Sequence, residues 1–155
     1  AGRPVTTRIP PGVRDGQKIR LRGKGRPGTA GGPDGDLVVT VHVTPHPVFS
    51  LDGNNLRITV PVTFPEAALG ATIAVPTLDG STVKVKVPAG TPSGRTLRVR
   101  GRGVKTAKST GDLLVTVQVA VPQKLSKAAR EAVETFAAET AGQDVRADLV
   151  RQAAE

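Results

Sequence analysis

The sequence predicts a mainly β protein, with two tandem β-sandwich-like domains, each with a short helix, and a C-terminal helix. Three observations lead to this prediction. Short runs of β-branched residues are separated by turns that contain Gly, Pro and Asp. One block of sequence occurs twice, in the same order. After residue 122 the spacing of apolar residues changes from that of strands to that of a helix.

Eight short segments have the composition of strands. In residues 37–43 every odd position is apolar, as is typical of a strand with one buried face. Pro65 and Gly70 bracket a short helical turn, because Pro suits the start of a helix and Gly its end. The expected strands are Val5–Ile9, Lys18–Arg22, Leu37–Val43, Leu56–Val62, Ala71–Val75, Thr82–Val87, Thr96–Arg100 and Leu113–Val121.

The internal repeat covers most of the β region. Residues 9–25 resemble residues 87–103, and residues 35–41 resemble residues 111–117. The two blocks occur in the same order in both copies. The number of positions that separates the copies changes only in the loop between the blocks. Two copies of one small β unit, joined near residues 75–81, explain this pattern better than one large sheet.

From Ser126 onward the sequence has the pattern of an amphipathic helix. Ser126 is a suitable N-cap, Gly142 a suitable end, and residues 145–153 have a second helical pattern. The apolar stripe of the first helix comprises Ala129, Ala132, Val133 and Phe136. We therefore expect a first β domain over residues 1–75, a second over residues 76–122 and a helical tail over residues 123–155.

The composition excludes several functions. The chain has no Cys and no Met, which rules out a disulfide framework, a thiol nucleophile and a cysteine-ligated metal site. No apolar run approaches the ~20 residues of a membrane helix, and no signal-peptide pattern opens the sequence. The β region is basic, with 17 Lys and Arg against 7 Asp and Glu in residues 1–122.

No motif predicts catalysis. Gly23, Gly25 and Gly28 have the spacing of a dinucleotide fingerprint, but the Gly- and Pro-rich segment that follows cannot open the helix that a pyrophosphate needs. His42 and His46 are separated by Pro45 and have no third metal ligand nearby. Carboxylates are few, and Asp112 repeats Asp36 in the second copy, which favours a role in turns over an acid–base pair, so we expect no enzyme.

Two basic stripes run along the repeat. Arg20, Arg22 and Lys24 alternate on one strand, and Arg98, Arg100 and Arg102 do so on its copy. Such stripes could follow phosphates. The aromatic residues on which single-stranded nucleic acids stack are nearly absent, so a solvated outer face is the simpler interpretation.

Several short motifs are similar to those of a known family. The most specific are His46-Pro47-Val48-Phe49, Val75-Pro76-Thr77-Leu78-Asp79-Gly80 and Gly111-Asp112-Leu113. Together with 52–56, 66–70 and 101–104, they resemble the C-terminal region of bacterial DnaJ, the J-domain co-chaperone of the DnaK ATPase. The resemblance runs from about residue 5 to about residue 136.

This resemblance implies that the chain binds unfolded polypeptide and, in the full-length protein, delivers it to a DnaK-type chaperone during protein folding and the stress response. It implies a cytoplasmic homodimer that needs neither a membrane nor nucleic acid. The J-domain, the Gly/Phe linker, the first strands and the zinc-binding Cys repeats of the family lie upstream and are not part of this sequence. We therefore expect no cofactor in these residues, with zinc confined to such an upstream module.

The resemblance also assigns the groove residues, and the apolar stripe of the tail gives the residues of the expected dimer interface. The peptide groove is expected at Val5, Thr7, Ile9 and Phe49, where a large apolar side chain lies beside a strand with a free edge. The dimer interface is expected at Leu125, Ala129, Ala132, Val133 and Phe136.

Two other functions fit the sequence. One is a basic β protein that binds nucleic acid without specificity, which would show steep salt dependence. The other is a dimerisation module that does not bind substrate.

Overall fold

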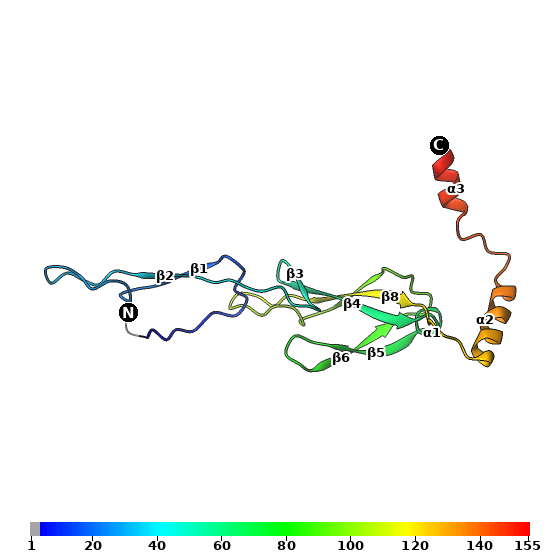
Figure 1. Cartoon of the computed structure of the whole chain (residues 1–155), viewed down its shortest axis with the longest axis horizontal. Coiled ribbons are helices and arrows are strands. Elements are labelled where there is room, and N and C mark those ends of the chain that lie inside the picture. Colours follow the sequence, from blue (N-terminus) through cyan, green and yellow to red (C-terminus); the bar gives the residue numbers. More distant parts are fainter. Residues whose placement is uncertain (1–3) are drawn as a thin grey trace. The chain divides into compact units, whose positions relative to one another are not determined.

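The computed structural model describes residues 4–155, and the chain forms two compact units, Ala1–Ala120 and Val121–Glu155. The first unit holds the strands and one short helix, and the second holds two helices (Figure 1). A mainly β fold with several sheets, short helices and a helical C-terminus is therefore confirmed. Within residues 4–120 the structure contains α1 alone, so the expected second short helix is not found there.

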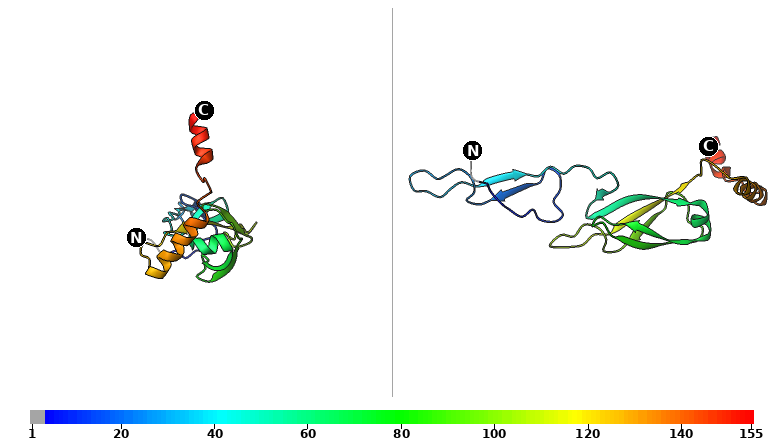
Figure 2. Two further views of the ribbon diagram at one scale, coloured as in Figure 1. Left: turned by 90° about the vertical axis from the view of Figure 1, so that its right-hand side faces the viewer. Right: turned by 60° about the horizontal axis from the view of Figure 1, so that its bottom comes forward.

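The strands of the first unit form three sheets. The central sheet has the order β3-β4-β8-β7, and two further sheets are the antiparallel pairs β1–β2 and β5–β6 (Figures 1 and 2). The strand bounds are β1 Lys18–Leu21, β2 Leu37–Thr40, β3 Ser50–Asp52, β4 Asn55–Thr63, β5 Ala71–Pro76, β6 Thr82–Val87, β7 Thr96–Val99 and β8 Leu113–Ala120.

The parallel pair β4–β8 is the centre of the core. Its register runs from Leu56 opposite Leu113 to Thr63 opposite Ala120. Leu113, Val115 and Val117 are fully buried in β8, and they share one apolar cluster with residues of β4, β5 and β6. The hairpin β5–β6 therefore contributes to the same core as the central sheet.

Helix α1 (Phe64–Leu69) follows β4 directly, as the bracketing Pro and Gly predict. The Thr63 hydroxyl accepts a hydrogen bond from the Glu66 N–H, and the Glu66 carboxylate accepts one from the Thr63 N–H. This reciprocal capping box satisfies two donors at the helix start. Gly70 ends the helix with φ of 87°, a conformation that favours glycine.

The internal repeat corresponds to two hairpins with the same hydrogen bonds, β1–β2 and β7–β8. The Asp36 carboxylate accepts from the Gly23 N–H at 3.0 Å and from Arg20 at 2.6 Å. In the second hairpin the Asp112 carboxylate accepts from the Gly101 N–H at 2.9 Å and from Arg98 at 2.7 Å.

A pair of glycines also matches between the two hairpins. A Cβ atom on Gly25 or Gly103 would lie 2.5 Å from backbone atoms of the facing strand, so both hairpins require glycine at this crossing.

The structure corrects the expected domain boundary at residue 75. That boundary falls inside β5, and the central sheet takes β4 and β8 from opposite sides of it. The buried core cluster begins at Phe49 and reaches Val117, whereas the β1–β2 hairpin lies outside it. The residues from Phe49 to Ala120 therefore share one core, because β4 finds its parallel partner in β8.

Two strand predictions are also wrong. Residues 5–9 form no strand, because Pro4, Pro10 and Pro11 flank them and remove hydrogen-bond donors at both ends. Strand β2 ends at Thr40 instead of residue 43, and the Val43 N–H instead bonds to the Asp15 carboxylate at 2.9 Å. The three-residue strand β3 was too short to be expected from composition.

The second unit contains α2 (Lys127–Glu139) and α3 (Ala147–Ala154). The Ser126 side chain accepts a hydrogen bond from the Ala129 N–H at 3.1 Å, so the expected N-cap is confirmed. Helix α2 ends at Glu139 with Thr140 as its C-cap, before Gly142, which was expected to end it. Among the described residues, no helix is long and apolar enough to span a bilayer.

Candidate peptide-binding site

The first unit contains an apolar hollow of about 610 Å³ beside the start of the central sheet. Three stretches of chain line it, within residues 12–15, 43–46 and 49–56, together with Leu78 and Val104. Its apolar lining consists of Val13, Val43, Pro45, Phe49, Leu51, Leu56, Leu78 and Val104. This mixture of buried and exposed aliphatic side chains can hold a large apolar group.

Phe49 forms the floor of this hollow and belongs to the core. Its side chain is 8% exposed, and its ring meets the His46 ring edge-on with centroids 5.2 Å apart. His46 Nδ1 accepts hydrogen bonds from the backbone N–H groups of Val48 and Phe49, at 3.0 and 3.3 Å. The His-Pro-Val-Phe motif is therefore a local turn that fixes Phe49 in place.

Most charged groups at this hollow are paired within the protein. Arg14 Nη2 donates to the Gly53 carbonyl at 2.8 Å and to Asn54 Oδ1 at 3.0 Å. Asp15 accepts from the Val43 N–H. The apolar groups remain accessible, since Leu51 is 48% and Leu78 53% exposed.

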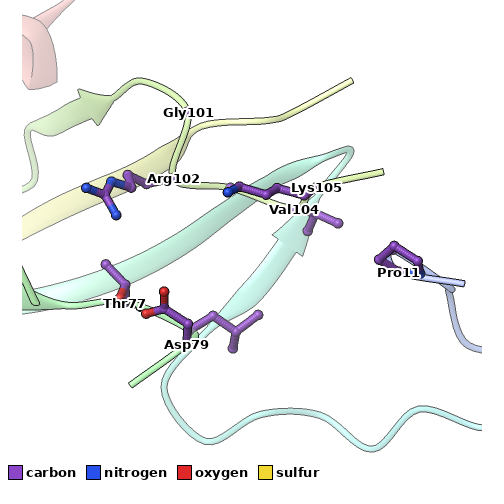
Figure 3. Close-up of a pocket in the computed structure, with 10 residues that line it drawn as sticks. Pro11, Thr77, Asp79, Gly101, Arg102, Val104 and Lys105 are labelled. Carbon is purple, nitrogen blue, oxygen red and sulfur yellow. Dashed lines mark hydrogen bonds between the residues drawn. The ribbon is translucent and has the colours of Figure 1, made fainter. Parts of the chain in front are cut away.

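A second hollow of about 690 Å³ adjoins the first and shares Gly12, Leu78 and Val104 with it. Figure 3 shows Arg102 and Lys105 on one side of it and Thr77 and Asp79 on the other.

The carboxylate in this second hollow is already hydrogen-bonded. The hydroxyl groups of Thr77 and Ser81, and the Ser81 N–H, donate to Asp79. These bonds, together with the positive charge of Arg102, hold the pKa of Asp79 well below its ordinary value. Asp79 is therefore a fixed anion that shapes the 77–81 turn.

The structure brings together only part of the predicted groove. Phe49 lines the apolar hollow, whereas Val5, Thr7 and Ile9 are exposed, belong to no strand and line neither hollow. Val13, Leu51 and Val104 were not predicted from the sequence, because isolated aliphatic residues in loops or in a three-residue strand have no periodic signal. Leu78 lies in the Val75–Gly80 motif that resembles DnaJ, and this motif could have pointed to Leu78 as a site residue.

In each basic stripe one cation forms an ion pair within the fold. Arg20 pairs with Asp36 at 2.6 Å and Arg98 with Asp112 at 2.7 Å, so each stripe has its first cation neutralised. This pairing reduces the charge available for phosphates.

The family described as DnaJ C terminal domain matches residues 2–122. The chain belongs to the DnaJ family. The resemblance stated from the sequence is thereby confirmed.

Several relatives with the name Chaperone protein DnaJ come from actinobacteria. The chain is 56% identical over 154 residues to "Chaperone protein DnaJ 1" of Streptomyces avermitilis, covering 99% of this chain and 39% of the relative. It is 63% identical over 137 residues to "Chaperone protein DnaJ 2" of Mycolicibacterium paratuberculosis, covering 88% and 35%. It is 61% identical over 131 residues to "Chaperone protein DnaJ 2" of Cutibacterium acnes, covering 84% and 34%. The chain thus spans less than two fifths of the length of these DnaJ relatives.

Proposed function

We propose that this chain is the client-binding and dimerisation region of a DnaJ-type co-chaperone. The observation that carries the proposal is the family match over residues 2–122, joined to an apolar hollow with exposed aliphatic walls. Unfolded polypeptides differ from folded ones in presenting large apolar side chains to water. A hollow of this size and lining takes one such side chain at a time and discriminates little among sequences.

The longer protein passes the bound client to a DnaK-type ATPase in the cytoplasm. This chain contributes binding and no catalytic step. Weak, sequence-tolerant binding suits this role, because a client must leave the co-chaperone when the ATPase captures it.

The helical tail joins two copies of the chain. Val133 and Phe136 on α2 are about half exposed, Ala129 and Ala132 share their apolar stripe, and Leu125 lies just before the N-cap. Small Ala side chains let two helices approach closely, and Phe136 adds the largest apolar area. Two copies held together would grip one unfolded chain at two points, which raises the effective affinity.

Binding of a fluorescently labelled, permanently unfolded client, followed by anisotropy, tests the proposal. Phe49 is a core residue, so a substitution there would also disturb the fold, and the exposed residues Leu51 and Leu78 are better probes. We expect the double variant Leu51→Ser with Leu78→Ser to weaken client binding several-fold. Leu69→Ser is the matched control, since Leu69 is exposed on α1 and lies outside the hollow. Equal affinities for wild type and the double variant would refute this site, and a wild-type dimer without client affinity would favour the pure dimerisation module.

A further inference from the structure

The two hollows of the first unit adjoin each other. Gly12, Leu78 and Val104 line both of them, so the apolar hollow that contains Phe49 lies next to the hollow lined by Arg102 and Lys105. A ligand segment lying across Leu78 would therefore touch an apolar surface at one end and a charged one at the other.

The charged end is cationic. Arg102 and Lys105 are both exposed, and neither forms an ion pair within the described residues 4–155. They come from the same loop and lie on the same side of the hollow (Figure 3). The facing Asp79 is held by Thr77 and Ser81, so two cations stand against one carboxylate that already has its hydrogen-bond donors.

We propose that these two adjoining hollows together select extended polypeptide segments in which a large apolar residue lies a few residues from an Asp, a Glu or a terminal carboxylate. The apolar side chain occupies the hollow above Phe49, and the carboxylate lies between Arg102 and Lys105. The proposal rests on the proposed client binding and adds a preference among clients.

Charge complementarity determines the sign of this preference. A carboxylate is attracted by both cations and repelled by the single charge of Asp79, so the two cations decide the sign, whereas a Lys or Arg at the same place is repelled by both cations. The groove is open to water, so the gain is modest, on the order of threefold to tenfold in affinity for two exposed pairs. The adjoining apolar walls favour a peptide over a nucleic-acid phosphate, which has no aliphatic group to place there.

Three labelled peptides test the preference. The three peptides share one apolar sequence and differ at a single position, which is Glu, Gln or Lys. Further sets of three vary the spacing from that position to the largest apolar residue. We expect the Glu peptide to bind the whole chain about threefold to tenfold more tightly than the Gln peptide, and the Lys peptide more weakly than either. Raising the salt concentration should bring the three affinities together.

The double variant Arg102→Gln with Lys105→Gln should abolish the difference in affinity between the Glu and Gln peptides. Lys84→Gln, which removes an exposed charge from β6 outside both hollows, should keep the difference. Equal affinity of the Glu and Gln peptides for wild type would overturn the preference alone. Binding of none of the three peptides would overturn client binding itself. Displacement of the Glu peptide by a single-stranded oligonucleotide at similar affinity would overturn the assignment to peptides.

Discussion

The side-chain oxygen of Asn55 accepts a hydrogen bond of 2.8 Å from the backbone N–H of Asp112, across 57 positions of sequence. The next backbone N–H, that of Leu56, donates to the Asp112 carbonyl at 2.9 Å. Asp112 in turn holds Gly101 and Arg98 through its carboxylate. The Asn55–Asp112 pair therefore joins the start of β4, the start of β8 and the turn that follows β7.

Replacing Asn55 with Leu should destabilise the first unit by about 1–3 kcal/mol, because the half-buried N–H of Asp112 loses its acceptor. Urea unfolding followed by circular dichroism measures this change. Gln118→Leu makes a similar change at an exposed position of β8 and should alter stability by less than about 0.5 kcal/mol. Equal effects of the two substitutions would contradict the role assigned to Asn55.

Gly111→Ala should be strongly destabilising. A Cβ atom at residue 111 would lie 1.8 Å from the Asn54 carbonyl oxygen, so β4 and the β8 hairpin would have to separate. We expect a cost of about 1–3 kcal/mol or more in the free energy of unfolding. The control is Gly35→Ala at the matching position of the first hairpin, where the nearest atom is 3.8 Å away and the cost should be small.

The two repeated carboxylates should make the fold sensitive to acid. Hydrogen bonds from the Gly23 N–H and Arg20 lower the pKa of Asp36, and the Gly101 N–H and then Arg98 lower that of Asp112. A group with a lowered pKa in the folded state stabilises the fold above its ordinary pKa, and this stability is lost as the pH falls below about 4.

The thermal midpoint should therefore drop as the pH is lowered from 5 to 2 in the wild type. In the double variant Asp36→Asn with Asp112→Asn the midpoint should start lower and fall less steeply. Parallel curves for the two proteins would show that other groups cause the acid sensitivity.

Phe136→Asp should convert the dimer into a monomer. Burying Phe136 removes ~150 Å² or more from water, and a carboxylate in that interface would lose its hydration. Sedimentation equilibrium at micromolar concentration measures the state of each protein. Leu149→Asp on α3 is the control, because α3 lies outside the proposed stripe and this variant should remain dimeric. A chain ending at residue 122 that still dimerises would place the interface elsewhere.

Local features were well predicted from sequence, because they depend on neighbouring residues. The capping of α1 and α2, the alternation in β6 and the repeated hairpin all follow from composition and spacing. The parallel pairing of β4 with β8 could not be predicted in this way, since alternation of apolar residues defines a face and does not name a partner. The expected boundary at residue 75 was wrong for this reason.

The candidate site was less predictable than the fold. Phe49 was expected to line the groove, and it does line the hollow, but as a core residue, because His46 directs its backbone into a turn that buries the ring. Val5 and Ile9 have strand composition, yet the prolines around them prevent pairing. The groove instead depends on single residues such as Leu78 and Val104, which come together only after the sheets have formed.

The pairing of β4 with β8 also fixes an order of events during synthesis. The β1–β2 hairpin is complete once residue 40 has left the ribosome, and it needs only contacts that are near in sequence. Strand β4 must wait, with its aliphatic face uncovered, until β8 has been made more than fifty residues later. Sheets built from such distant segments form slowly and expose apolar surface in the meantime. The nascent chain therefore passes through a stage in which it is itself an unfolded polypeptide of the kind it is proposed to bind.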